Sequence, residues 1–432
     1  MSASEAIVEF RRVGEQERIF HYLHALGSLI PSSALRVRGP LPAELLRRAL
    51  DWLQRHHPVL RAHIRYEGYA FRSVPPFWYP IPILDTRGTS PIPLRVVTTT
   101  DAEAWSAEFR KESSTPIGRG THPRMRIVLV HAGDDADLHH IIMTCDHAIA
   151  DAQAASMIID DLFRYLSDPP ALEARPVIHK SLPPSLEEGL SHKPKGNGRY
   201  QPAIRFPKTE VPSPVRETRS VQRTLDPSAA NALRDAIRAR RTTMHGAIGA
   251  AFLVAARDKF GANEMTVLST VELRRMMRPP LPVTAFGCYI DILRTHHRLG
   301  DDFWAMASDL SFKLIAALAR DQEAASILKL ATWEIYKHET VPTMTHRKRI
   351  DGIALTTAGA SHANKNYGPL TIEENNGGVS IDMFGPSLFI VSTETDGDLD
   401  IKVGYAADAL SGEDAIDLTE RAVAALLAAA RA

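Results

Sequence analysis

The chain has 432 residues, of which 44% are hydrophobic and 24% charged, so it is long and apolar enough to fold as a globular protein of two or three domains. Its 51 basic and 51 acidic residues cancel, which argues against a nucleic acid or an anionic membrane surface as the main partner. Two cysteines, Cys145 and Cys288, are too few for a disulfide framework or a four-cysteine metal site.

The first 168 residues predict alternating helices and strands. Apolar residues at positions 45, 46, 49, 50 and 53 have helical spacing, and Pro58 follows the end of that pattern. Two β-rich runs surround a Gly-Asp-Asp turn within 124–147, which is typical of a hairpin. In chain order we expect a strand at 33–41, a helix within 42–57, a strand at 61–66, a helix at 101–113, the hairpin, and a helix at 150–166.

Proline marks a boundary in the middle of the chain. Ten of the 29 prolines lie between positions 169 and 214. Because proline fixes its own φ and lacks a backbone donor, this stretch cannot be a regular helix or a central strand. We therefore predict an N-terminal lobe at 1–168, an interlobe linker at 169–215 and a C-terminal lobe at 216–432; the alternative is a long ordered loop inside one domain.

The second half also mixes helices and strands, without a regular alternation of the two. Asp226 is suited to cap a helix that begins at Pro227. We expect strands at 219–225, 265–273, 286–299, 352–359, 387–394 and 398–406, and helices at 227–240, 242–260, 303–320, 324–338 and 412–430. The pattern predicts an α+β fold with two lobes and mixed sheets.

The most informative motif is His147-x-x-x-Asp151, at the junction between a buried β-run and a helix. A histidine there can act as a general base, since its ordinary pKa near 6.5 lets it accept a proton at neutral pH. The aspartate can either orient the imidazole or turn away to hold the loop. The spacing alone is common in proteins, and a structural histidine is the alternative.

The surrounding segments resemble the His-x-x-x-Asp acyltransferases, a family that includes chloramphenicol-acetyltransferase-like enzymes, plant BAHD enzymes, peptide-synthetase condensation domains and polyketide-associated acyltransferases. The similarity covers 41–64, 137–166, 240–257 and 271–291, and more loosely 354–359 and 381–391, in the family's order. Three positions depart from the pattern. Asp146 stands where many relatives have a first histidine, Ala152 replaces a glycine, and Pro386 ends the Asp-Phe-Gly-x-Gly turn.

The resemblance implies roles for five residues. His147 would be the catalytic base, and Asp151 would pair with Arg274, with Arg275 as a rival partner. Thr356 or Thr357 would donate a hydrogen bond to the oxyanion, and at most one can do so because neighbours on a strand point to opposite faces. The alternative for both threonines is simple β-propensity.

The family also implies the fold and the reaction: two chloramphenicol-acetyltransferase-like lobes with a cleft or channel between them, which transfer an acyl group from acyl-CoA or an acyl carrier protein to a hydroxyl acceptor. No bound cofactor or metal is expected. The alternatives are a condensation-type enzyme that forms an amide, and a catalytically silent binding protein. We expect a cytoplasmic monomer, since the charged N-terminus lacks a signal sequence and no apolar run nears the roughly 18 residues of a membrane helix.

The remaining candidates have simpler interpretations. His56 and His57 are expected to pack at a helix end, and each of the pairs His139-His140 and His296-His297 points to two faces of a strand, so neither pair chelates one metal. Cys145 is expected to be a small buried residue. The basic run 347–349 could contact a phosphate, an acidic carrier protein or only solvent.

Overall fold

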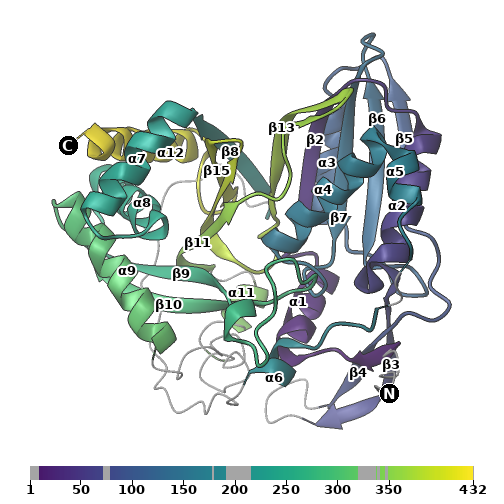
Figure 1. Cartoon of the computed structure of the whole chain (residues 1–432). Coiled ribbons are helices and arrows are strands. Elements are labelled where there is room, and N and C mark those ends of the chain that lie inside the picture. The colour runs from purple at the N-terminus through teal and green to yellow at the C-terminus, as the bar shows by residue number, and fades with distance from the viewer. Residues whose placement is uncertain are drawn as a thin grey trace. The chain divides into compact units, whose positions relative to one another are not determined.

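The computed structural model describes residues 9–71, 78–177, 180–190, 216–319, 337, 341–345 and 349–431, which form two compact units (Figure 1). The first unit contains Met1–Ser191, Leu273–Tyr289 and His362–Gly377, and the second contains His192–Glu272, Ile290–Ser361 and Gly378–Ala432. The predicted α+β class is confirmed, because each unit combines helices with a sheet of parallel and antiparallel strands.

This division differs from the contiguous lobes 1–168 and 216–432. Segments 273–289 and 362–377 come from the C-terminal half but belong to the first unit, because the former carries the arginine that binds Asp151 and the latter supplies sheet strands. Within the predicted linker 169–215, helices α5 (Pro169–Glu173) and α6 (Leu186–Gly189) also belong to the first unit. Residues 191–215 lie outside the described residues, so their linking role stays a prediction.

A six-stranded sheet in the order β12-β13-β2-β7-β6-β5 organises the first unit. Strand β7 is antiparallel to β2 and β6, and its burial on both faces makes it the central strand that leads to His147. A smaller sheet has the order β1-β4-β3. The bounds are β1 Phe10–Arg12, β2 Pro31–Arg38, β3 His63–Phe71, β4 Trp78–Asp85, β5 Leu94–Thr99, β6 Met125–Ala132, β7 Leu138–Cys145, β12 Asn366–Tyr367 and β13 Leu370–Val379.

The helices of the first unit follow from where their apolar residues fall. In α2 the predicted stripe is buried, with Leu46, Ala49, Leu50 and Leu53 at 0% exposure. Helix α1 was not expected, because its buried face is largely polar. The bounds are α1 Glu15–Ala25, α2 Ala43–His56, η1 Pro58–Arg61, α3 Ala104–Ser114, α4 Ala152–Ser167 and η2 Arg274–Met276.

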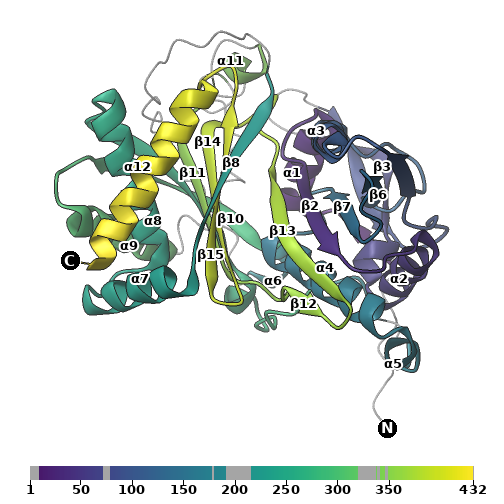
Figure 2. The ribbon, with the colours of Figure 1, turned by 90° about the horizontal axis from the view of Figure 1, so that it is seen from above.

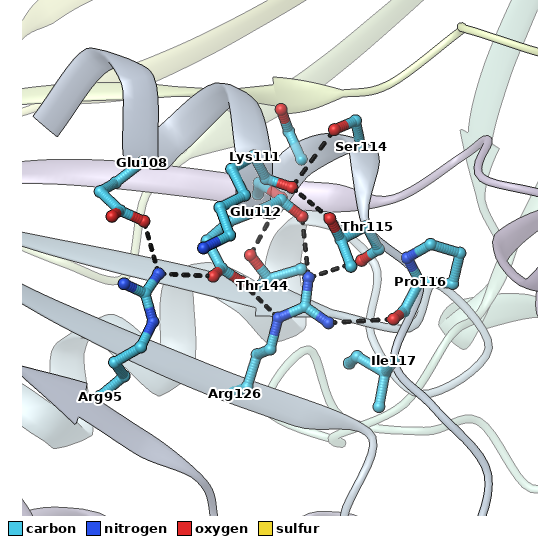
Figure 3. Close-up of polar contacts among 12 residues, drawn as sticks. Arg95, Glu108, Lys111, Glu112, Ser114, Thr115, Pro116, Ile117, Arg126 and Thr144 are labelled. Carbon is cyan, nitrogen blue, oxygen red and sulfur yellow. Dashed lines mark hydrogen bonds and ion pairs between the residues drawn. The ribbon is translucent and has the colours of Figure 1, made fainter.

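Helix α3 is held on its sheet by charge as well as by Trp105 and Phe109, which pack against apolar residues of that sheet. Its one buried residue is Glu112, which binds Arg126 of β6 and lies 3.0 Å from Nη2 of Arg95 of β5 (Figure 3). Arg126 also donates to the carbonyl oxygens of Thr115 and Pro116. These bonds fix the helix end over strands that lead toward the His147 region.

The second unit has a six-stranded sheet in the order β10-β9-β11-β14-β15-β8, in which β11 is parallel to both neighbours and the other pairs are antiparallel. Helices α7, α8, α9 and α12 lie on one side of this sheet (Figure 2). The bounds are β8 Thr218–Leu225, β9 Glu264–Glu272, β10 Ile290–Arg298, β11 Ile350–Ala360, β14 Pro386–Thr395, β15 Asp398–Ala406, α7 Pro227–Ala239, α8 Met244–Phe260, α9 Phe303–Ala319, α11 Val341–Met344 and α12 Gly412–Arg431.

Local signals explain the ends and packing of α8. Thr243 accepts a bond from the amide of Gly246 at the start, and Gly261 has φ of 64° at the end. A Cβ on Gly249 would come within 2.3 Å of the Leu310 side chain of α9, so the glycine leaves room for Leu310 in its present position.

Most predicted elements are confirmed with shifted ends. The hairpin is β6 and β7, and helix α4 begins at Ala152 rather than residue 150. The strand expected at 286–299 begins only at Ile290, because 286–289 belong to the first unit. The helix expected at 324–338 lies outside the described residues, apart from residue 337. Across the described part of the chain, none of the helices combines the length and the apolar character needed to cross a bilayer.

Candidate active site

His147 occupies the loop between β7 and α4 and is 9% exposed. Its ring stacks on Phe20 of α1, with centroids 4.3 Å apart and an interplanar angle of 11°. The Nδ1 atom lies 3.8 Å from Cys288 Sγ. Burial lowers the pKa of His147, while hydrogen bonds to the backbone of His147 and Ala150, together with the charge of Asp151, act in the opposite direction. The imidazole is therefore neutral at pH 7 and able to accept a proton.

Asp151 turns away from the imidazole and holds the loop. Its Oδ2 lies 2.8 Å from Arg274 Nη1 and its Oδ1 lies 3.0 Å from Nη2, which makes a two-pronged ion pair. Asp151 also accepts bonds from the amides of Tyr289, at 3.0 Å, and Ala154, at 2.9 Å, the latter as N-cap of α4. Of the two arginines considered, Arg274 is the partner.

The fully buried Arg274 side chain uses the rest of its guanidinium on backbone oxygens. Nε donates to Ala285 O at 2.9 Å, and Nη2 donates to Gly287 O at 3.2 Å. The neighbouring Arg275 is exposed. One arginine thus ties the loop of His147 to segment 273–289, which also carries Cys288.

Asp146 anchors the other end of the same loop, a role that the sequence did not indicate. Its carboxylate is 0% exposed and accepts bonds from Arg124 Nη2 at 2.7 Å and from the amide of Ala148 at 3.0 Å. His21 Nδ1 lies 2.7 Å from the same carboxylate. Burial alone would raise the pKa of Asp146, yet His24, Arg124 and His21 hold it well below its usual range.

Thr356 and Thr357 lie on β11 in the second unit, and their side chains have different partners, as expected for neighbours on a strand. Thr356 donates to Thr270 Oγ1 at 2.8 Å. Thr357 Oγ1 lies 3.1 Å from His245 Nδ1, and His245 Nε2 lies 2.8 Å from Ser269 Oγ. Burial lowers the pKa of His245 to about 4, so the Ser269–His245–Thr357 chain is neutral at pH 7.

The remaining candidates have structural partners. His57 Nε2 lies 2.9 Å from Asp161, His139 Nε2 lies 3.1 Å from Gly39 O, and His297 Nδ1 lies 2.8 Å from Asp309. Within the described residues, no three histidine, cysteine, aspartate or glutamate side chains form a group able to hold a metal ion. Arg349 is buried and paired with Asp408, whereas Arg347 and Lys348 lie outside the described residues.

The cysteines differ in their surroundings. Burial raises the pKa of Cys145 to about 12, so its thiol stays protonated. Cys288 is 1% exposed and contacts the imidazole of His147, a proximity that their 141-residue separation concealed.

A protein family matches part of the chain. Residues 214–363 match the family described as phthiocerol/phthiodiolone dimycocerosyl transferase C-terminus. Among curated proteins, 138 residues are 29% identical to cyclosporin synthetase of Tolypocladium inflatum and 156 residues are 28% identical to chondramide synthase of Chondromyces crocatus. These matches cover 31% and 32% of this chain but only 1% and 4% of the relatives, so the chain spans a small part of their length.

Solved structures share the fold over nearly the whole chain. The trichothecene 15-O-acetyltransferase of Fusarium sporotrichioides has a TM-score of 0.73 at 14% identity, covering 97% of this chain and 95% of that one. Polyketide synthase associated protein 5 of Mycobacterium tuberculosis has a TM-score of 0.64 at 16% identity, covering 95% and 96%. The condensation domain of the monacolin K polyketide synthase has a TM-score of 0.68 at 13% identity, covering 99% and 98%.

Proposed function

The chain belongs to the superfamily of chloramphenicol-acetyltransferase-like and condensation-domain acyltransferases, and on this premise we propose that it transfers an acyl group from a thioester to a hydroxyl acceptor. The observation that carries the proposal is the neutral, buried imidazole of His147, held in a loop whose flanking aspartates are both bound by arginines. Because those carboxylates are engaged elsewhere, the base in this loop is the imidazole.

In the proposed reaction His147 takes the proton of the acceptor hydroxyl while the oxygen attacks the thioester carbonyl. Since Nδ1 faces Cys288, we assign Nε2 as the atom that receives the proton. The tetrahedral intermediate then collapses, the carbon–sulfur bond breaks, and the imidazolium returns the proton to the leaving thiolate. The thioester is already activated, so this sequence needs no resident cofactor and no acyl-cysteine.

Thr357 is the better of the two oxyanion-donor candidates, because its hydroxyl hydrogen can be free to donate. If Ser269 donates to His245 Nε2, then His245 Nδ1–H donates to Thr357 and leaves the Thr357 hydroxyl hydrogen free for an oxyanion. Thr356 instead gives its hydrogen to Thr270. We propose Thr357 as the donor.

The acyl donor is proposed to be acyl-CoA or an acyl carrier protein, as in a tailoring step of secondary metabolism or lipid synthesis. The functions of the matched proteins support acyl chemistry of this kind, since one is a 15-O-acetyltransferase and one a dimycocerosyl transferase family. The same relatives include condensation domains, so amide formation is the competing outcome.

The test measures thiol release and product mass with purified wild-type protein, His147→Ala, and the control His122→Ala, which removes an exposed histidine. Acyl-CoA donors, the same acyl groups on a carrier protein, and pooled alcohols and amines are supplied. We expect acceptor-dependent turnover that falls by about 10²–10⁴ in His147→Ala and is unchanged in His122→Ala.

Three results would contradict parts of the proposal. Equal turnover in wild type and His147→Ala would remove His147 as the base. An amide product would show that the protein is a condensation-type enzyme and not one that forms esters. No turnover with any acceptor pool, together with no binding of any donor, would favour a catalytically silent binding protein.

A further inference from the structure

Helix α1 contacts two neighbouring residues of the loop that carries His147. Phe20 stacks on the His147 ring, with centroids 4.3 Å apart, and the next residue of the helix, His21, lies 2.7 Å from the Asp146 carboxylate. All four side chains are buried and belong to the first unit. Two consecutive residues of α1 therefore contact two consecutive residues of the motif loop.

A chain of hydrogen bonds continues from Asp146 through His21 to the smaller sheet. His21 Nδ1 lies 2.7 Å from Asp146 Oδ2, and His21 Nε2 lies 2.8 Å from Oη of Tyr66 on β3. Both imidazole nitrogens are thus engaged, one by a carboxylate and the other by a phenol. The chain joins three elements, α1, β3 and the loop before α4, which only the folded unit brings together.

The partners of Asp146 set the direction of each bond in this chain. Arg124 donates to Asp146 Oδ2 from Nη2 at 2.7 Å and from Nε at 3.1 Å, so the carboxylate is ionised and only accepts. His21 therefore donates from Nδ1. Since Arg124 already balances the charge of Asp146, we assign His21 as the neutral imidazole, whose Nε2 accepts the hydroxyl hydrogen of Tyr66. The bonds run in one direction, from Tyr66 to His21 to Asp146.

Asp146 transmits this restraint to the base. Its Oδ1 accepts a bond from the amide of Ala148 at 3.0 Å, so one carboxylate holds the backbone on both sides of His147. Arg124 directly precedes β6, whose first residue pairs with the last residue of β7, the strand that leads into the loop. His21 comes from α1 instead, so it ties the loop to a second element. Hydrogen bonds to an ionised group are about twice as strong as neutral ones, which makes this tie a firm one.

We propose that His21 and Tyr66 are positioning residues: the chain from Tyr66 through His21 to Asp146 fixes the place of the His147 imidazole against α1. Neither residue gives or receives the transferred proton. Their effect on catalysis rests on the proposed function, whereas their effect on the placement of His147 does not.

The first measurement reads the placement of His147 without any turnover. Diethyl pyrocarbonate modifies neutral imidazoles that it can reach, and peptide mass spectrometry of the full chain gives the rate at each histidine. Tyr66→Phe removes the phenolic hydrogen bond, so we expect the rate at His147 to rise about fivefold relative to His139, a buried histidine of the same unit. Tyr69→Phe changes a 70%-exposed tyrosine of the same strand and should match wild type.

Two substitutions of His21 with side chains of similar size separate hydrogen bonding from packing. Leucine has no donor, whereas the asparagine amide can donate to Asp146 from near the place of Nδ1. We expect His21→Leu to raise the modification rate at His147 more than Tyr66→Phe does, and His21→Asn to recover part of that change. Equal rates in His21→Leu and His21→Asn would show that the ring only fills space, and would overturn the positioning role.

The second measurement is the steady-state kinetics of the same variants in the acyl-transfer assay. Because the chain places the base and is not assigned a substrate contact, we expect kcat to fall about fivefold in Tyr66→Phe with KM within about twofold of wild type. His21→Leu should lose more, and His21→Asn should recover part of the loss.

The two measurements keep the positioning role apart from the proposed function. No turnover by wild type would count against acyl transfer, and the modification rates would still decide whether the chain positions His147. Wild-type rates at His147 in both Tyr66→Phe and His21→Leu would overturn the positioning role. An equal rise at His139 would do the same, because it would indicate general loosening of the unit.

Discussion

The loop 146–151 of the first unit and the sheet around Thr357 of the second unit differ in how their buried polar side chains are paired. The loop is fixed by ionised pairs, Asp146 with Arg124 and Asp151 with Arg274. The sheet is fixed by neutral bonds, from Ser269 through His245 to Thr357 and from Thr356 to Thr270. Removing one member of a buried ion pair leaves an unpaired charge, whereas removing one neutral partner leaves an unpaired neutral group, which costs less free energy. The loop should therefore tolerate substitution far less than the sheet.

The largest effect is expected for Asp151→Asn. Asparagine can still cap α4, but it leaves the fully buried Arg274 without its counter-ion, which costs about 3–5 kcal/mol of unfolding free energy. Activity and folded yield should fall together in denaturation and turnover assays. The matched control is Asp168→Asn, an N-cap of α5 with no buried arginine, for which we expect a change below about 1 kcal/mol. Full stability with lost activity in Asp151→Asn would instead indicate a direct catalytic role.

A somewhat smaller effect is expected for Asp146→Asn. Arg124 keeps its bonds to the carbonyl oxygens of Ile117 and Gly118 but loses its carboxylate, so we expect a loss of about 3 kcal/mol. The charge of Asp146 also raises the pKa of His147, so its removal should shift the acid limb of the kcat/KM profile to lower pH. Asp135→Asn breaks only an exposed pair with Arg38 and serves as control. An acid limb at the same pH as in wild type would show that the charge of Asp146 does not affect the pKa of His147.

In the second unit the expected change is in rate rather than in stability. Thr357→Val removes the proposed oxyanion donor and should lower kcat by about 10²-fold, with a loss of about 1 kcal/mol in unfolding free energy. Thr356→Val removes the neighbouring hydroxyl from the other face of the same strand and should leave kcat within a few-fold. Equal kcat values for both variants and wild type would exclude both threonines as donors.

The pH dependence of stability compares one buried histidine from each unit. Burial lowers the pKa of His24 to about 4, as it does for His245. An unfolded histidine binds a proton near pH 6.5, so each of these groups makes the unfolding free energy fall as the pH drops from about 6.5 to about 4, by about 1 kcal/mol per pH unit. We expect His245→Gln and His24→Gln each to flatten that slope by this amount in urea titrations at pH 7, 6 and 5. A slope that stays as steep would mean that the substituted imidazole is already charged in the fold.

The two regions also differ in what the sequence could predict. The hairpin, α2 and the helix after the motif carry plain apolar periodicity, and they lie where expected apart from their ends. Helix α1 buries Gln16, Glu17, His21 and His24, so it has no apolar stripe from which it could be predicted. Strand β13 contains Asn-Asn-Gly-Gly, which is typical of a turn, and it becomes a strand only because β2 offers an edge.

Within the candidate site, contacts between residues far apart in the sequence could not be predicted from local patterns. His147 and Asp151 are four residues apart and formed a visible motif, whereas the Asp151–Arg274 pair spans 123 positions and followed only from the family resemblance. Nothing local showed that His21, 125 positions away, approaches Asp146, or that Cys288 approaches His147. Such pairings are set by tertiary packing, which periodicity does not encode.

The smallest effect is expected for substitutions of Cys288, which is a weak hydrogen-bond partner of His147. Cys288 Sγ lies 3.8 Å from His147 Nδ1, and a thiol is a weak donor and acceptor, so this contact orients the imidazole only slightly. Cys288→Ser and Cys288→Ala should each keep kcat within about threefold of wild type in the acyl-transfer assay, because the proposed reaction forms no bond to sulfur. An acyl-cysteine mechanism predicts near-complete loss in both variants, together with an acyl adduct on Cys288 detectable by mass spectrometry of the wild-type protein. Retained turnover without an adduct would assign the proton transfer to the imidazole and leave the thiol as a packing neighbour.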